Sequence, residues 1–138
     1  MRNLITGGAG FVGSHLCEKL VNKGEYVVCL DNFLTGNKNN IIHLQKNKNF
    51  KLIEKDVRES FSLDVDRIWH LACPASPFQY QKDPIETALI LSEGTKNMLQ
   101  LAAQKKAKFL LASSSEIYGN PLIHPQCEKY NGNVNPME

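Results

Sequence analysis

The chain has 138 residues, enough for one domain with a sizeable core, and its 42% hydrophobic and 22% charged residues are ordinary for a soluble globular protein. A formal net charge of +2 excludes a strong general attraction to nucleic acids or membrane surfaces. The first apolar run is too short for a secretory signal or a membrane span, and the four cysteines form no CxxC pair, so we expect reduced thiols in a cytoplasmic protein.

Short apolar runs alternate with longer helical patterns along the chain. Residues 11–22 follow the first apolar run and predict a helix that ends at Lys23-Gly24. Asp83 and Pro84 have the residue types of a helix N-cap and first helical position, and they open the longest helical pattern. In chain order, we predict strands at 3–6, 26–31, 50–54, 67–72 and 108–113, and helices at 11–22, 38–46 and 84–106. This alternation predicts an α/β fold with a doubly wound, Rossmann-type parallel sheet.

The alternation stops after Ser113. Residues 114–138 contain several glycines, prolines and asparagines and no further strand pattern. We therefore expect the fifth strand to form an open edge of the sheet.

The stretch ITGGAGFVG joins the first predicted strand to the first predicted helix. Its glycines fit two spacings, Gly8-x-Gly10-x-x-Gly13 and Gly7-x-x-Gly10-x-x-Gly13. Glycine permits a tight turn, close approach of a diphosphate to the backbone, and close packing of the helix against the sheet. Free N–H groups and the helix dipole favour phosphate charge at the start of the helix. The stretch therefore predicts a dinucleotide site.

Two aspartates at strand ends extend this prediction. Asp31 ends the second predicted strand, where a carboxylate can accept hydrogen bonds from the ribose hydroxyls of the adenosine half. It would repel a 2′-phosphate, so the sequence favours NAD over NADP; an aspartate that merely starts a turn is the alternative. Asp56 and Val57 follow the third strand and are candidates for the adenine edge, again with a turn as the alternative.

Longer motifs cover nearly the whole chain. They are TGGAGFVGSHL, DNFLTG, HLACPASPFQYQ (70–81), LLASSSEIYGNP (110–121) and HPQCEKYNGNVNP (124–136). Together they resemble the extended short-chain dehydrogenase/reductases, and within them the UDP-glucuronate decarboxylases, also called UDP-xylose synthases. The SSEIYG and NGNVNP stretches are much more specific than the glycine turn.

The resemblance implies a site for NAD and a site for a UDP-sugar, with no metal ion. The implied NAD-binding positions are Gly7, Gly10, Phe11, Val12, Gly13, Asp31, Asn32, Leu34, Thr35, Gly36, Asp56, Val57, Leu71, Cys73 and Ala112. The implied substrate-binding positions are Ala75 and Tyr80. The four histidines lack the spacing of metal ligands, which agrees with the implied absence of a metal.

The implied reaction converts UDP-glucuronate to UDP-xylose with loss of carbon dioxide. In this family NAD oxidises the sugar at C4, the resulting β-keto acid loses carbon dioxide, and the ketone is then reduced again. By the resemblance, Ser114 is the catalytic hydroxyl that hydrogen-bonds the C4 oxygen, and Glu116 orients the carboxyl group or relays a proton. Taken alone, Ser114 could be a polar strand end and Glu116 an exposed glutamate.

The family's Tyr-x-x-x-Lys acid–base pair does not occur within this chain. Tyr118 and Tyr130 are followed four residues on by Leu122 and Val134. By the same resemblance, the later substrate domain is missing as well. We therefore expect residues 1–138 to be an incomplete NAD-binding Rossmann domain, truncated after about five strands. It should be inactive alone and belong to an enzyme that forms a homodimer at full length.

Three interpretations stay open. The first is an N-terminal portion of a UDP-glucuronate decarboxylase, the second a non-catalytic module that binds NAD or a nucleotide sugar, and the third a sibling 4-epimerase or 4,6-dehydratase. Glu116 and the PASPFQYQ stretch favour the decarboxylase.

Overall fold

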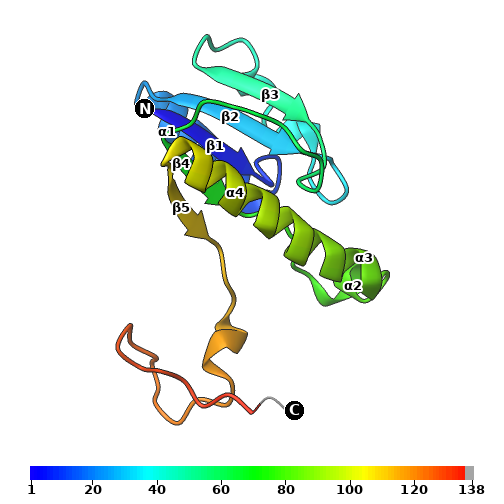
Figure 1. Cartoon of the computed structure of the whole chain (residues 1–138), viewed down its shortest axis with the longest axis vertical. Helices are drawn as coiled ribbons and strands as arrows, with labels where there is room; N and C mark the ends of the chain where they lie inside the picture. The colour runs from blue at the N-terminus through cyan, green and yellow to red at the C-terminus, as the bar shows by residue number, and fades with distance from the viewer. Residues whose placement is uncertain (136–138) are drawn as a thin grey trace.

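The computed structural model describes residues 1–135 and contains a five-stranded parallel sheet in the order β3-β2-β1-β4-β5 (Figure 1). The strands are β1 (Arg2–Thr6), β2 (Tyr26–Asp31), β3 (Phe50–Glu54), β4 (Arg67–His70) and β5 (Lys108–Leu111). The central strand β1 pairs with both β2 and β4, so the strand order reverses on its two sides. This is the predicted doubly wound Rossmann arrangement.

Helices cover both faces of the sheet (Figure 1). Helix α1 (Phe11–Asn22) lies on one face, together with the short 3₁₀ turns η1 (Lys38–Asn40) and η2 (Ile42–Leu44). A long helix crosses the other face; its parts are α3 (Pro84–Leu89), a π-helical turn η3 (Ile90–Gly94) and α4 (Thr95–Lys105). The remaining helical turns are α2 (Pro77–Tyr80) and η4 (Ser115–Tyr118).

Alternate residues of the central strands enter two separate cores. Leu4 of β1 packs in one core with Met98 of α4, while the next residue, Ile5, packs in the other with Cys17 of α1. All four of these side chains are at most 1% exposed. Because both faces of the strands are buried, the strands read as continuous apolar runs in the sequence.

Two predicted strands end earlier than expected. The predictions for 67–72 and 108–113 were two residues too long, since β4 ends at His70 and β5 at Leu111. The physical reason is the end of β1 at Thr6, where Gly7 turns the chain away with a positive φ of 68°. Beyond that point the neighbouring strands have no partner for continued pairing.

The predicted helix at 38–46 is wrong as a single helix. It forms the two 3₁₀ turns η1 and η2, and the Asn37 side chain accepts a hydrogen bond from the backbone N–H of Asn39. Asparagine side chains compete in this way with helical hydrogen bonds and favour turns.

The long predicted helix is confirmed, apart from its π-helical turn. Asp83 accepts a hydrogen bond from the backbone N–H of Glu86 at 3.0 Å, as expected of an N-cap. The helix ends where Lys106 adopts the left-handed conformation. Gly94, at the end of η3, faces Val57: a Cβ atom at this glycine would lie 2.5 Å from Val57 Cγ2.

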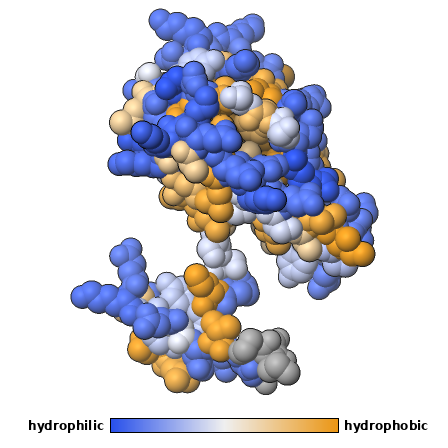
Figure 2. All heavy atoms as spheres, in the orientation of Figure 1, coloured by the Kyte–Doolittle hydropathy of each residue, from blue (hydrophilic) through white to orange (hydrophobic). Residues whose placement is uncertain are grey.

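After β5 the chain leaves the sheet as a C-terminal arm, residues 112–135 (Figure 1). The arm contains an isolated bridge between Gly119 and Asn133 and a stacked pair of rings, Tyr118 and Tyr130. Hydrophobic side chains are exposed on the arm and over β5 (Figure 2), and Leu111 is 53% exposed. Within the described residues, β5 is therefore an edge strand, as predicted.

Two further properties bear on the expectations from the sequence. Across residues 1–135, no helix has both the length and the apolar character needed to cross a bilayer. All four cysteines are free thiols: Cys17 and Cys29 are buried, Cys73 is half-buried and Cys127 is exposed.

Candidate functional site

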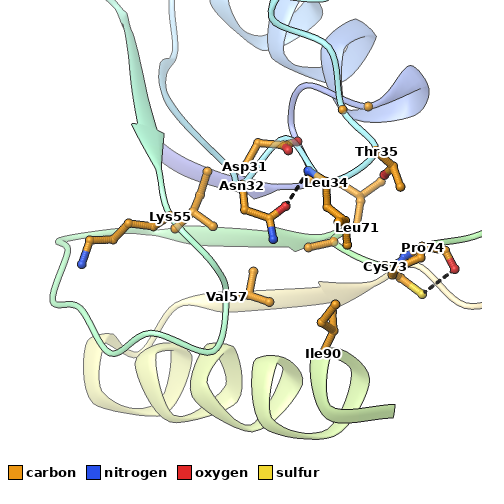
Figure 3. Close-up of a pocket in the computed structure, with 15 residues that line it drawn as sticks. Asp31, Asn32, Leu34, Thr35, Lys55, Val57, Leu71, Cys73, Pro74 and Ile90 are labelled. Carbon is orange, nitrogen blue, oxygen red and sulfur yellow. Dashed lines mark hydrogen bonds between the residues drawn. The ribbon is translucent and has the colours of Figure 1, made fainter. Parts of the chain in front are cut away.

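A pocket opens at the carboxyl ends of the strands, around the point where the strand order reverses (Figure 3). In doubly wound sheets, ligands bind in this crevice. The loops after β1, β2, β3 and β4 and one residue of the long helix form its walls. The lining residues are Gly7, Gly10, Leu30, Asp31, Asn32, Leu34, Thr35, Gly36, Lys55, Val57, Leu71, Ala72, Cys73, Pro74 and Ile90.

The glycine turn forms one wall of the pocket, and its glycines have different tasks. Gly7 has a positive φ, and a Cβ there would lie 2.9 Å from the backbone of Leu71. A Cβ on Gly13 would collide with the carbonyl oxygen of Gly7, so this glycine allows α1 to pack against the turn. Gly10 lies at the N-cap of α1, and a Cβ there would meet only the Gly7 oxygen, at 3.2 Å. Gly10 therefore keeps open the space in front of the helix, where the first N–H groups lack intrahelical partners.

Asp31 lies in the pocket with its carboxylate held by two backbone groups. Oδ2 accepts a hydrogen bond from Ala9 N at 2.9 Å, and Oδ1 accepts one from Phe33 N at 2.8 Å. The residue is only 6% exposed. An ionised carboxylate has about four acceptor positions, so about two remain for a ligand. The alternative prediction for Asp31 was an aspartate that starts a turn. Asp31 does this as well, because the hydrogen bond from Phe33 N, two residues further on, closes such a turn.

The loop after β2 is tied to the glycine turn. The backbone N–H of Asn37 and the side-chain amide of Asn40 both donate to the carbonyl oxygen of Ala9, at 3.1 and 2.9 Å. Gly36 lies so close to Asp31 that a Cβ there would be 2.8 Å from Oδ1. The loop therefore wraps around the Asp31 carboxylate and fixes its direction.

His70 supports the wall that follows β4. The Thr6 hydroxyl oxygen accepts hydrogen bonds from the backbone N–H groups of Leu71 and Ala72, both at 3.2 Å. Its own proton is thus assigned to His70 Nδ1 at 2.7 Å, which leaves His70 Nε2 to donate to Thr95 Oγ1 at 3.2 Å. Burial lowers the pKa of His70 to about 4, so its ring is neutral at physiological pH.

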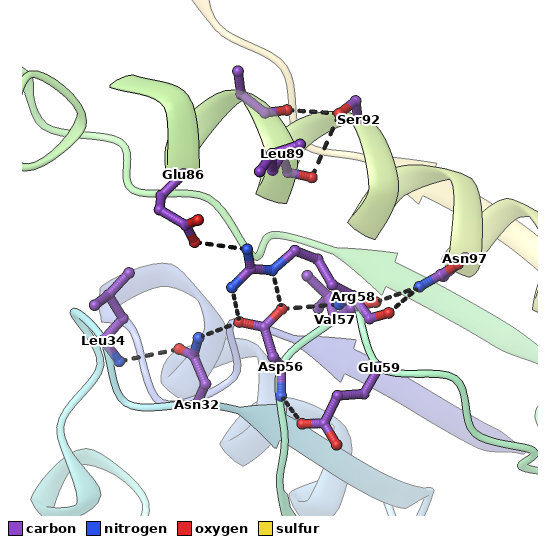
Figure 4. A network of polar contacts seen from close by, with 11 residues as sticks. Asn32, Leu34, Asp56, Val57, Arg58, Glu59, Glu86, Leu89, Ser92 and Asn97 are labelled. Atoms are coloured by element: carbon purple, nitrogen blue, oxygen red, sulfur yellow. Dashed lines mark hydrogen bonds and ion pairs between the residues drawn. The ribbon is translucent and has the colours of Figure 1, made fainter. Parts of the chain in front are cut away.

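Ten of the fifteen residues predicted to bind the cofactor line the pocket. They are Gly7, Gly10, Asp31, Asn32, Leu34, Thr35, Gly36, Val57, Leu71 and Cys73. The other five are outside the lining: Phe11, Val12, Gly13, Asp56 and Ala112. Phe11 and Val12 are 81% and 59% exposed on the first turn of α1, and Ala112 is exposed just beyond β5. The carboxylate of Asp56 accepts hydrogen bonds from Arg58 and Asn32 (Figure 4).

Five lining residues were not predicted: Leu30, Lys55, Ala72, Pro74 and Ile90. Four of them are sequence neighbours of predicted residues. Their position near the carboxyl end of a strand could have indicated that they line the pocket. Ile90 differs, because it comes from the long helix and reaches the pocket at its π-helical turn. A helical apolar pattern indicates the buried face but not this contact.

The predicted catalytic residues lie together on the arm and away from the pocket. Ser114 and Glu116 are both exposed, at the start of η4, and none of the pocket-lining residues comes from the arm (Figure 1). A hydrogen bond that the Ser114 hydroxyl donates to the carboxylate of Glu116 is the main reason why the pKa of Glu116 lies below its usual value. Every hydrogen bond found for residues 114–134 within the described chain joins two residues of that stretch.

The predicted substrate-binding residues come after the pocket-lining residues 71–74 in the sequence, but they do not line the pocket themselves. Ala75 is exposed, and Tyr80 at the end of α2 is 38% exposed. In residues 1–135 no three His, Cys, Asp or Glu side chains lie together as a metal site would require.

Comparisons with known proteins identify the family. The family model described as GDP-mannose 4,6 dehydratase matches residues 4–137. The chain belongs to the GDP-mannose 4,6-dehydratase family. It also shares 55% identity over 137 residues with UDP-glucuronic acid decarboxylase 1 of Arabidopsis thaliana, which confirms the resemblance seen in the motifs. That alignment covers 99% of this chain and 32% of the Arabidopsis protein, so the chain spans about a third of this relative's length.

Solved structures that superpose on this chain have the same fold. A UDP-galactose 4-epimerase superposes with a TM-score of 0.81 at 30% identity, over 97% of this chain and 45% of the epimerase. The UDP-glucose 4-epimerase of Thermus thermophilus in complex with NAD gives 0.77 at 29% identity, over 96% and 44%. Both confirm the Rossmann-type sheet.

Proposed function

We propose that this chain supplies the NAD-binding portion of a UDP-glucuronate decarboxylase. Its 55% identity to UDP-glucuronic acid decarboxylase 1 of Arabidopsis thaliana supports the reaction class. The pocket at the carboxyl ends of the strands supports dinucleotide binding. The whole enzyme's reaction is part of the proposal, because the chain spans only 32% of that relative.

The observation that carries the proposal is the state of Asp31. Its carboxylate faces the pocket and has two of about four acceptor positions free, which fits the two adjacent hydroxyls of a ribose. Gly10 leaves open space at the start of α1, as a diphosphate requires. The residues of this chain therefore fit NAD.

Different parts of the pocket would hold different parts of NAD. Asp31 would accept hydrogen bonds from the adenosine ribose, and its negative charge would disfavour NADP. Gly10 and the first N–H groups of α1, at Phe11, Val12 and Gly13, would bind the diphosphate. Leu71 and Cys73 would border the nicotinamide half, with Ala112 beyond them. When bound, NAD supplies reversible hydride acceptance.

Ser114 and Glu116 would act on the sugar. Ser114 would donate a hydrogen bond to the C4 oxygen, and Glu116 would orient the carboxyl group or move a proton. Overall, the carboxyl group leaves as carbon dioxide, a proton takes its place at C5, and UDP-xylose is formed. Ala75 and Tyr80 would contact the UDP-sugar. A homodimer of the full-length enzyme and a cytoplasmic location complete the proposal.

A second candidate function is binding without turnover. The observation that favours it is the exposed position of Ser114 and Glu116 on the arm, outside the pocket lining. In that case the chain would bind NAD and release no carbon dioxide from UDP-glucuronate.

Calorimetric titration with NAD and NADP tests the proposal. We expect the chain to bind NAD more tightly than NADP, and Asp31→Asn to weaken NAD binding by about tenfold or more, because hydrogen bonds to a charged acceptor are lost. Asp66→Asn is the matched control. Asp66 also accepts a hydrogen bond from a backbone N–H, that of Arg2, but it lies at the amino end of β4, whereas the pocket is at the carboxyl ends of the strands. Equal affinity for NAD and NADP would contradict the proposal.

A carbon dioxide assay with UDP-glucuronate and NAD separates the two candidates. We expect no release by this chain alone, whereas measurable release would show that the chain needs no further residues for turnover. Release by the chain mixed with the remaining two thirds of a relative would favour the decarboxylase over the simple binding module.

A further inference from the structure

The long helix contacts the segment that follows β3, residues 56–58, at three points (Figure 4). Glu86 of α3 accepts a hydrogen bond from Arg58 Nη1 at 2.7 Å. Gly94 of η3 faces Val57, because a Cβ atom at this glycine would lie 2.5 Å from Val57 Cγ2. Asn97 of α4 contacts the backbone of both Val57 and Arg58. The position of this segment therefore depends on the long helix.

Of these three contacts, the one from Asn97 fixes the backbone of the segment. Its side-chain nitrogen Nδ2 donates to the carbonyl oxygen of Val57 at 3.1 Å and to that of Arg58 at 2.7 Å. A side-chain amide has two N–H groups, so each carbonyl oxygen accepts one of them. Because two consecutive carbonyl groups are bound to one planar amide, the backbone torsion angles between them have little freedom.

The backbone that Asn97 fixes carries a residue of the pocket wall. Val57 lines the pocket together with Leu34 and with Ile90 of the same long helix (Figure 3). The side chain of Val57 is almost fully buried, at 4% exposure. A valine side chain is stiff about χ1, so a fixed backbone also fixes the position of its two methyl groups. Asn97 itself is half-buried and does not line the pocket.

We propose that Asn97 is a positioning residue for the purine base of the bound dinucleotide. It acts through Val57, which it keeps in the pocket wall before the base binds. The inference rests on the proposed function, with the adenine edge at Asp56 and Val57. Without the side-chain amide of Asn97, the wall would have to be ordered when the base binds, and this ordering would reduce the affinity.

Saturation-transfer NMR with NAD tests the proposal, because adenine and nicotinamide protons of one ligand molecule report separately on their contact with the chain. We expect Asn97→Leu to bind NAD about fivefold more weakly, the cost of ordering one side chain on binding. The saturation of the adenine protons should fall relative to that of the nicotinamide protons. A general loss of structure would lower both signals together and leave their ratio unchanged.

Asn133→Leu is the matched control. The side-chain amide of Asn133 also donates to a backbone carbonyl oxygen, that of Asn120 at 3.0 Å, but both residues lie on the arm. This variant should keep the wild-type affinity and the wild-type ratio of the two signals. An unchanged ratio in a folded Asn97→Leu variant would overturn the proposal.

NMR relaxation of the backbone amides in the wild-type chain provides a second test, which does not depend on how well a variant folds. The N–H groups of Arg58 and Glu59 share their peptide planes with the two carbonyl groups that Asn97 binds. We expect their order parameters to be about 0.85 without NAD and to stay unchanged when NAD is added. Order that arises only on addition of NAD would overturn the proposal. If the wild-type chain does not bind NAD, the proposed function itself is wrong, and this inference with it.

Discussion

Asp31 and Asp56 both lie at the carboxyl ends of strands, but different groups donate hydrogen bonds to their carboxylates. Asp31 ends β2, and Asp56 lies two residues after the end of the neighbouring strand β3. Two backbone donors reach Asp31 and four donors reach Asp56, three of them from Arg58. Asp31 thus keeps about two acceptor positions for a ligand, while Asp56 also ties the segment after β3 to Asn32 in the loop after β2.

The glycine turn allows binding and folding to be separated with two substitutions. We expect Gly10→Ala to change the free energy of unfolding by less than about 1 kcal/mol, since its Cβ would meet only one atom at 3.2 Å and φ is −74°. It should weaken NAD binding by about tenfold or more, because the new methyl group occupies the space in front of α1. Gly13→Ala should destabilise the chain by about 3 kcal/mol, because its Cβ would collide with backbone atoms of Gly7.

Urea denaturation and NAD titration of the two variants check this prediction. A Gly10→Ala variant that binds NAD like the wild type would show that the diphosphate does not approach this glycine. A Gly13→Ala variant of unchanged stability would show that α1 can move away from the turn.

At the scale of elements, His70 connects two strands and a helix. It lies on β4, its Nδ1 contacts Thr6 of β1, and its Nε2 contacts Thr95 of α4. In the sequence it could be interpreted only as a histidine without metal-ligand spacing. Its burial, at 3% exposure, results from the strand pairing of β1 with β4 and could not be predicted from its neighbours in the sequence.

The buried ring of His70 predicts a pH dependence of stability. Its pKa is lowered from 6.5 to about 4, so below pH 6.5 the unfolded chain takes up a proton that the folded chain does not. Stability is therefore fully present above pH 6.5 and decreases as the pH falls toward about 4. The loss between about pH 7 and pH 5 should be about 2 kcal/mol.

Urea denaturation at the two pH values measures this effect. His70→Asn should be less stable than the wild type at neutral pH and should lose the pH dependence in this range. The carboxyl group of Asp56 has a pKa below 3.8, so it stays ionised at pH 5 and does not contribute. A wild-type chain that is equally stable at both values would contradict the prediction.

The π-helical turn predicts an unusual effect of replacing glycine by alanine. In a helix this change normally stabilises by about 1 kcal/mol. At Gly94 we expect it to destabilise by about 1–2 kcal/mol, because the Cβ would lie 2.5 Å from Val57 Cγ2. Val57→Ala combined with Gly94→Ala should be more stable than the sum of the single changes predicts, by about 1 kcal/mol. A double-mutant cycle that measures the free energy of unfolding by urea denaturation tests this prediction. Additive effects of the two substitutions would exclude the contact between residues 94 and 57.

At the scale of the whole molecule, the topology could be predicted from patterns that are visible in the sequence. The strands at 26–31 and 50–54 and the helix at 11–22 have the predicted bounds, since short, mainly apolar runs mark the strands and Lys23-Gly24 marks the end of the helix. Residues such as Gly7, Asp31 and Leu71 could be placed in one pocket because the ends of parallel strands meet at one edge. The Arg58 contacts and the course of the arm depend on side-chain packing between distant segments, which periodicity does not encode.

The exposed edge of the sheet predicts self-association. Leu110 and Leu111 of β5 are 46% and 53% exposed, and an uncovered edge strand pairs readily with another chain. We expect sedimentation velocity to show association that increases with concentration, and Leu111→Lys to reduce it. Ile42→Lys is the control, because Ile42 is 58% exposed on η2, away from β5. A monodisperse monomer at all concentrations would contradict this expectation.

The arm also determines where its polar pair, Ser114 and Glu116, lies. The backbone N–H of Ala112 bonds to the His70 carbonyl oxygen at 3.0 Å, while the hydrogen bonds found for residues 114–134 within the described chain stay inside that stretch. Residues 112–114 therefore join the sheet to this hydrogen-bonded stretch. Their backbone torsion angles set where the stretch, and Glu116 with it, lies relative to the pocket.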